Sequence, residues 1–170
     1  MIAALALAAA LLLPAPPGPA QPAPSITTTV TPAPERQWAI QRPTRGAHAR
    51  AVQRAATIPP QHRQWAACVL DRESGGTLDR PQSGSGARNP ASSAQGRWQF
   101  LNNNWQRGLS FMVRDRLVQF EMPKQQAAAV RRYLGARPIA SWDGWYQDIG
   151  FNEVVERGGA HHWNGGSHSC

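Results

Sequence analysis

A long stretch rich in proline, alanine and threonine limits how much of this 170-residue chain can form a packed domain. Residues 14–60 read PAPPGPAQPAPSITTTVTPAPERQWAIQRPTRGAHARAVQRAATIPP, and only AHARAVQRAA shows even a weak helical pattern. This composition is typical of an extended linker. We therefore expect a linker over residues 24–60, which the fold does not need, and one domain over residues 61–170. That leaves about 110 residues, enough for a hydrophobic core.

The chain begins with an apolar run from Ile2 to Leu13 that ends at Pro14. This run has the length of a signal-peptide hydrophobic region and is too short to span a bilayer, although no Lys or Arg precedes it. A buried N-terminal helix is the other interpretation, and the absence of a following amphipathic pattern disfavours it. We expect a signal peptide or weak signal anchor over residues 1–23. The protein would then be secreted or wall-associated, with no stable membrane span.

The sequence contains two cysteines, Cys68 and Cys170, at opposite ends of the predicted domain. An even number of cysteines in an exported chain favours a disulfide bond. The alternative is one buried and one stray thiol. The bond would hold Cys170 against the segment around Cys68.

Basic residues outnumber acidic ones, with a formal net charge of +8. An exported basic protein is attracted to polyanions such as phosphate-bearing wall polymers, and nucleic acid is the other standard candidate. The arginines are scattered and no recognised nucleic-acid-binding motif is present, so we do not expect nucleic acid as a partner. Lys124 is the only lysine among 18 basic residues, and GC-rich coding alone would produce such an excess of arginine. The positive charge is therefore a weak functional signal.

The domain reads as mostly helical with one irregular region. Expected helices cover PPQHRQWAACVLDRESGG, NNNWQRGLSFMVRDRL, PKQQAAAVRRYLG and, as one or two short helices capped by Ser141, SWDGWYQDIGFNEVVERGG. Between the first two lies the glycine- and serine-rich stretch TLDRPQSGSGARNPASSAQG followed by RWQFL, a loop or small hairpin. The fold class predicted is α+β, predominantly α-helical.

Three short motifs, CVLDRESGG, NPASSAQGRWQFLNNNW and HHWNGGSHSC, follow one another in this domain. Their order resembles the lysozyme-like fold of soluble lytic transglycosylases and resuscitation-promoting factors, over about residues 61–170. That resemblance implies a hairpin segment lining a cleft, a peptidoglycan substrate and Glu73 as general acid. It also places a cysteine before the acid and another near the C-terminus.

The resemblance extends residue by residue to the site. Ser74 follows the acid, as in the family's Glu-Ser pair. The motif Gly-Ala-x-Gly-Leu-Met-Gln matches at Ala94, Gly96 and Gln99, whereas Ser93, Arg97 and Trp98 replace its Gly, Leu and Met. The motif Tyr-Asn-Ala-Gly maps to Trp163, Asn164, Gly165 and Gly166, and His162 is a candidate substitute for the missing Tyr hydroxyl. The implied substrate-binding residues are Ser74, Ser93, Trp98, Gln99, His162, Trp163 and Asn164, with both tryptophans expected in the cleft.

The predicted chemistry is cleavage of the β-1,4 bond between N-acetylmuramic acid and N-acetylglucosamine. The acid must keep its proton near neutral pH, which the negative end of a helix dipole and partial burial would favour and a nearby Arg72 would oppose. A hydrolase usually needs a second carboxylate, and Asp79 is the candidate. A lytic transglycosylase does not, because the muramic acid C6 hydroxyl attacks intramolecularly and Glu73 acts first as acid and then as base.

Other functions stay open. The fold could serve a non-catalytic wall-binding or resuscitation-signalling module. His161, His162, His168 and Cys170 could form a zinc cluster, but the disulfide uses Cys170 better. We therefore expect a monomer without metal or cofactor, whose partner is the glycan strand of peptidoglycan.

Overall fold

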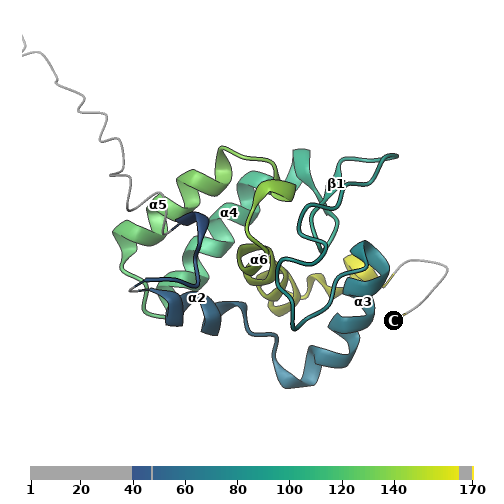
Figure 1. The fold of residues 1–170 in the computed structure, drawn as a ribbon, viewed down its shortest axis with the longest axis horizontal. Coiled ribbons are helices and arrows are strands. Elements are labelled where there is room, and N and C mark those ends of the chain that lie inside the picture. Colours follow the sequence, from purple (N-terminus) through teal and green to yellow (C-terminus); the bar gives the residue numbers. More distant parts are fainter. Residues whose placement is uncertain (1–39, 47, 165–169) are drawn as a thin grey trace, which may run out of the picture. The chain divides into compact units, whose positions relative to one another are not determined.

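The computed structural model describes residues 40–46, 48–164 and 170, with the side chains of residues 103 and 104 excepted. These residues form a predominantly helical α+β fold, as predicted (Figure 1). The α-helices are α2 (Ala49–Ala56), α3 (Arg63–Ser74), α4 (Asn102–Gln119), α5 (Lys124–Gly135) and α6 (Gly144–Glu156). The 3₁₀ helices are η1 (Pro60–His62), η2 (Ile139–Ser141) and η3 (Gly159–Trp163), and the strands are β1 (Ala94–Gln95) and β2 (Phe100–Leu101).

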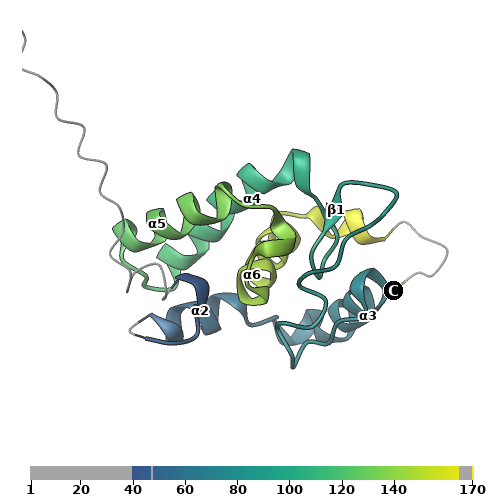
Figure 2. The same cartoon turned by 45° about the horizontal axis from the view of Figure 1, so that its top comes forward.

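Helix α6 is the centre of the core. Every residue from Tyr146 to Val154 is buried, and the helix packs against α2 and α4. Gly150 permits the close approach of α4, because a Cβ atom there would lie 2.9 Å from a methyl group of Leu109. Figures 1 and 2 show α4 and α5 side by side, with α6 between this pair and the loops that precede β1.

Helix α6 begins at a side chain other than the predicted one. Asp143 is its N-cap and accepts a hydrogen bond from the backbone nitrogen of Trp145 at 3.1 Å. Ser141, the predicted cap, lies in η2, and its hydroxyl donates to the carbonyl of Pro138. Trp142 lies between η2 and α6, and its extended backbone interrupts the helical conformation there.

The predicted domain boundary at residue 61 is too late, because α2 belongs to the core. Val52 is 1% exposed and Ala55 is 0% exposed. The carbonyl of Ala55 accepts hydrogen bonds from Arg116 Nε of α4 at 2.8 Å and from Asn152 Nδ2 of α6 at 3.1 Å. The predicted linker therefore does not extend to residue 60. Its residues 24–39 and the predicted signal peptide lie outside the described part of the chain.

The two strands form a short antiparallel hairpin in which Ala94 pairs with Leu101 and Gln95 with Phe100. The preceding segment, residues 75–93, consists of turns and isolated bridges. Among the described residues, no helix is long and apolar enough to cross a membrane.

Removing α2 should destabilise the domain strongly. A chain that begins at Ile58 would leave Arg116 and Asn152 without the Ala55 carbonyl, and each buried polar group left unpaired costs about 1–3 kcal/mol. We expect its melting temperature, followed by circular dichroism, to fall by roughly 10 °C or more relative to a chain beginning at Pro32. Equal melting temperatures would show that α2 is dispensable.

Candidate functional site

Glu73 lies in the last turn of α3, which ends at Ser74 because Gly75 adopts a left-handed conformation with φ of 65°. Its side chain is 23% exposed. Arg72 donates to Oε1 of Glu73 from Nε at 3.1 Å and from Nη2 at 2.7 Å. Among the described residues, no hydrogen bond reaches Oε2. Within the described part of the chain, Arg72 therefore holds the Glu73 carboxylate by one oxygen, Oε1.

Hydrogen bonds join the three sequence motifs around this glutamate. The hydroxyl of Ser74 donates to the carbonyl of Arg97 at 2.8 Å, which connects the end of α3 to the hairpin. Nη2 of Arg72 donates to the carbonyl of Trp163 at 2.6 Å, which connects α3 to η3. Nε1 of Trp163 donates to the carbonyl of Trp98 at 2.9 Å, which connects η3 to the hairpin. Segments far apart in the sequence therefore form one closed set of contacts.

The two tryptophans predicted to face a sugar are core residues instead. Trp98 is 0% exposed and stacks on Phe151, with ring centroids 3.7 Å apart. Trp163 is 5% exposed, and its ring is tilted against Phe151 at 4.9 Å. The prediction of sugar stacking is wrong for both, because α6 presents an aromatic surface on which they pack.

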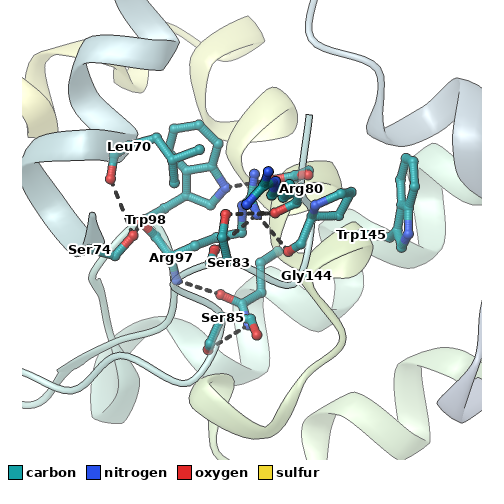
Figure 3. A network of polar contacts seen from close by, with 12 residues as sticks. Leu70, Ser74, Arg80, Ser83, Ser85, Arg97, Trp98, Gly144 and Trp145 are labelled. Carbon is teal, nitrogen blue, oxygen red and sulfur yellow. Dashed lines mark hydrogen bonds and ion pairs between the residues drawn. The ribbon is translucent and has the colours of Figure 1, made fainter. Parts of the chain in front are cut away.

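Arg97 is the residue that organises the loop before the hairpin (Figure 3). Its side chain is fully buried, and Nη1 donates to the carbonyls of Arg80, Pro81 and Ser83 at 2.9, 2.5 and 3.1 Å. Nη2 donates to the carbonyl of Thr77 at 3.1 Å. One guanidinium group thereby holds the turns that lead from α3 to β1.

Asp148 of α6 supplies the counter-charge to Arg97. Its Oδ1 lies 2.8 Å from Nε of Arg97 in an ion pair and accepts a hydrogen bond from Nε1 of Trp98 at 2.9 Å. Burial raises the pKa of Asp148 to about 7, against the opposing effects of Arg97 and Trp98. Burial also lowers the pKa of Arg97. The pair anchors the hairpin to α6.

Gln147 and two glycines complete the junction between α6 and the loop. Gln147 Oε1 accepts from the backbone nitrogen of Arg97 at 2.7 Å, and its Nε2 donates to the carbonyl of Ser85 at 3.0 Å. A Cβ atom on Gly96 would lie 2.2 Å from Gln147 Oε1, and one on Gly144 would lie 1.6 Å from the carbonyl oxygen of Pro81. Glycine is required at position 144 because the Pro81 backbone approaches so closely, and at position 96 because the Gln147 side chain fills the space and φ is 78°.

Arg97, Gln147 and Asp148 were not among the predicted site residues, although the sequence contains a signal for two of them. Arg97 and Asp148 are charged residues inside the otherwise apolar or aromatic segments RWQF and WYQDIGF. A charged residue in such a segment is either buried with a partner or functional. The pairing of Arg97 with Asp148 depends on the tertiary structure, and the periodicity of the sequence does not predict it.

The remaining predicted binding residues lie at the periphery. Gln99 is half-buried in the hairpin turn with φ of 50°, and its Nε2 donates to the carbonyl of Gly96. Ser93 is half-buried, and its carbonyl accepts from the backbone nitrogen of Asn102. His162 and Asn164 are exposed, and the ring of His162 meets Trp105 edge-on with centroids 4.7 Å apart.

Asp79, the candidate second carboxylate, is exposed in the turn that links Thr77 and Arg80. Hydrogen bonds from the Thr77 side chain and from its own backbone amide hold the pKa of Asp79 below its usual range. Its polar contacts therefore lie within its own turn, and none of those in the described residues connects it to Glu73.

Two of the surface hollows that described residues line do not include Glu73. The first, of about 440 Å³, lies beside α2 and the end of α4, and the second, of about 280 Å³, lies between the loop at Gln82 and the start of α6. No cluster of three or more potential metal ligands occurs in the described residues. Cys170 is committed to the disulfide, and His168 lies outside the described residues.

Comparison with protein-family models, with curated proteins and with solved structures finds no match to this chain. The case for a function therefore depends on the site and on the motifs in the sequence.

The predicted disulfide is present. Cys68 and Cys170 are bonded, with Cα atoms 5.7 Å apart and a sequence separation of 102. Cys68 lies in α3, about one turn before Glu73. The bond is a covalent connection between the helix that carries Glu73 and the chain beyond η3.

Loss of this bond should lower stability. Replacing Cys170 by serine should reduce the free energy of unfolding by about 2–5 kcal/mol, because the unfolded chain then gains the freedom that a long closed loop denies it. Chemical denaturation measures the change, and Cys68→Ser should reproduce it. Two alkylatable thiols in the oxidised wild-type protein would contradict the disulfide itself.

The strained backbone of Gln99 gives a second stability test. A residue with a Cβ atom is disfavoured at a positive φ, so Gln99→Gly should be more stable than Gln99→Ala by about 1 kcal/mol. Both variants lose the side-chain bond to Gly96, and the comparison isolates the backbone. Denaturant melts of the pair measure the difference, and a more stable alanine variant would argue against the left-handed conformation.

Proposed function

We propose that this protein is an exported peptidoglycan-cleaving enzyme, a lytic transglycosylase with a lysozyme-like domain. The observation that carries the proposal is the convergence of the three motifs on Glu73. Ser74, Arg72 and Trp163 provide the hydrogen bonds that join the end of α3, the hairpin and η3. An acid that sits where three separate segments meet can be aimed at a bound substrate by all of them.

In the proposed reaction, Glu73 gives its proton to the oxygen of the bond between N-acetylmuramic acid and N-acetylglucosamine. The C6 hydroxyl of the muramic acid attacks C1 as that bond breaks, and the hydroxyl proton passes to the Glu73 carboxylate. The products are a free N-acetylglucosamine end and a 1,6-anhydro-muramic acid end, and the acid is regenerated. Oε2 is the oxygen suited to both transfers, because Arg72 engages Oε1.

The surroundings of Asp79 favour this intramolecular route over hydrolysis. A retaining hydrolase needs its two carboxyl groups about 5–5.5 Å apart, and an inverting one about 6.5–9.5 Å apart. Asp79 is exposed and bonded within its own turn, so it is poorly suited to holding a water or a sugar opposite Glu73. The intramolecular reaction requires neither.

Substrate contacts are assigned to the polar groups around Glu73. Gln99 and Ser93 of the hairpin region and His162 and Asn164 of the η3 region carry hydroxyl, amide or imidazole groups and are half-buried or exposed. Hydrogen-bonding groups of this kind suit the hydroxyl and acetamido groups of a glycan. Ser74 is assigned a supporting role, because its hydroxyl already bonds the Arg97 carbonyl.

Export is supported by the disulfide, which forms and persists in oxidising compartments. The net charge of +8 suits an environment of anionic wall polymers. We propose that the enzyme acts as a monomer on glycan strands outside the cytosol.

Replacing Glu73 by glutamine tests the proposal. The change keeps the shape but removes the transferable proton, so release of anhydro-muropeptides from purified peptidoglycan should fall by roughly 10²–10⁴-fold. Mass spectrometry of the digest measures both the rate and the product. Circular dichroism should show an unchanged fold, since the Glu73 side chain is partly exposed and lies outside the hydrophobic core.

Asp79→Asn is the matched control, a carboxylate-to-amide change in the same region. It should retain nearly full activity in a transglycosylase. A crippled Asp79→Asn variant with hydrated products would favour a hydrolase instead. Wall binding by the wild-type protein without any cleavage would favour the non-catalytic module, and a folded Glu73→Gln variant with wild-type activity would refute the role of Glu73.

A further inference from the structure

Arg72 forms an ion pair with its neighbour in the sequence, Glu73. Adjacent side chains on a helix do not face each other, yet two nitrogens of Arg72 converge on one oxygen of Glu73, at 3.1 and 2.7 Å. The side chains are 21% and 23% exposed, so the contact is partly shielded from solvent. The nitrogen that makes the shorter bond also donates to the carbonyl of Trp163 at 2.6 Å.

The Trp163 carbonyl is a second acceptor for the Arg72 guanidinium. Because Nη2 bonds both the carbonyl of η3 and the carboxylate of α3, the position of the guanidinium depends on where η3 lies. Trp163 is itself fixed, since it is buried and its indole donates to the carbonyl of Trp98. The orientation of Glu73 is thereby connected to the packing of η3 against the hairpin.

We propose that Arg72 is a positioning residue. It holds Oε1 of Glu73, so that the orientation of the carboxyl group depends on η3 being packed against the hairpin. This inference rests on the proposed function. Arginine suits the role because its planar fork can bind a carboxylate and a carbonyl at once, which the single ammonium of lysine does with less directional control.

The chain contains a matched control for this pair. Arg114 and Asp115 of α4 are likewise sequence neighbours, and Nη2 and Nε of Arg114 both contact Oδ1 of Asp115. Their side chains are 34% and 50% exposed. In contrast to Arg72, Arg114 has no backbone carbonyl partner among the described residues. Arg114→Gln therefore removes an equivalent pair away from Glu73.

The test is a kinetic comparison with the full chain and soluble peptidoglycan fragments. Arg72→Gln should lower kcat for anhydro-muropeptide release by roughly 10–100-fold, the scale expected when a reacting group is misaimed, and should change KM by less than about twofold. Arg72→Lys should recover part of kcat because it restores the charge without the fork. Arg114→Gln should match the wild type.

The outcomes separate this inference from the proposed function. A wild-type protein that releases no anhydro-muropeptides refutes the proposed function and the inference that rests on it. An active wild type with unchanged kcat in Arg72→Gln, or with a change in KM alone, refutes only the role of Arg72. If the glutamine variant does not fold by circular dichroism, Arg72→Lys decides: a folded lysine variant with reduced kcat supports the role, and one with wild-type kcat overturns it.

Discussion

The buried ion pair between Arg97 and Asp148 is the interaction on which the region around Glu73 depends. A guanidinium group with no solvent exposure must find its partners inside the protein, and Arg97 finds four backbone carbonyls of the loop and the carboxylate of α6. Burying two charges is costly, and removing one partner of such a pair costs more than the pair contributes. These contacts of Arg97 hold the loop against α6.

Glu73 does not contact this pair directly but is connected to it through hydrogen bonds of neighbouring residues. The backbone of Arg97 receives the hydroxyl of Ser74, and the backbone of Trp98 receives the indole of Trp163, whose carbonyl in turn receives Arg72. The core ion pair thus holds the hairpin, and the hairpin contacts both the end of α3, which carries Glu73, and η3, which reaches Glu73 through Arg72. The side chain proposed to do the chemistry is held by groups that need never touch substrate.

Local signals in the sequence predicted much of the fold. Gly75 ends α3 and Gly135 ends α5 where the pattern places them, and the disulfide joins the expected cysteines. Helix α2 was missed because its buried face consists mainly of alanine in only eight residues, too weak a pattern beside the proline-rich stretch. The prediction for Trp98 and Trp163 was wrong because a sequence motif does not show whether a side chain points into the cleft or into the core.

The contact of α2 with α6 also has a kinetic consequence. The hydrogen bond from Asn152 to the Ala55 carbonyl spans 97 positions in the sequence, and the disulfide spans 102. Contacts between distant positions slow folding, because the intervening chain must lose entropy before they form. During synthesis, α2 has no central helix to pack on until α6 has also been made. This domain should consequently fold late and nearly as a unit, more slowly than a helical bundle built from neighbouring hairpins.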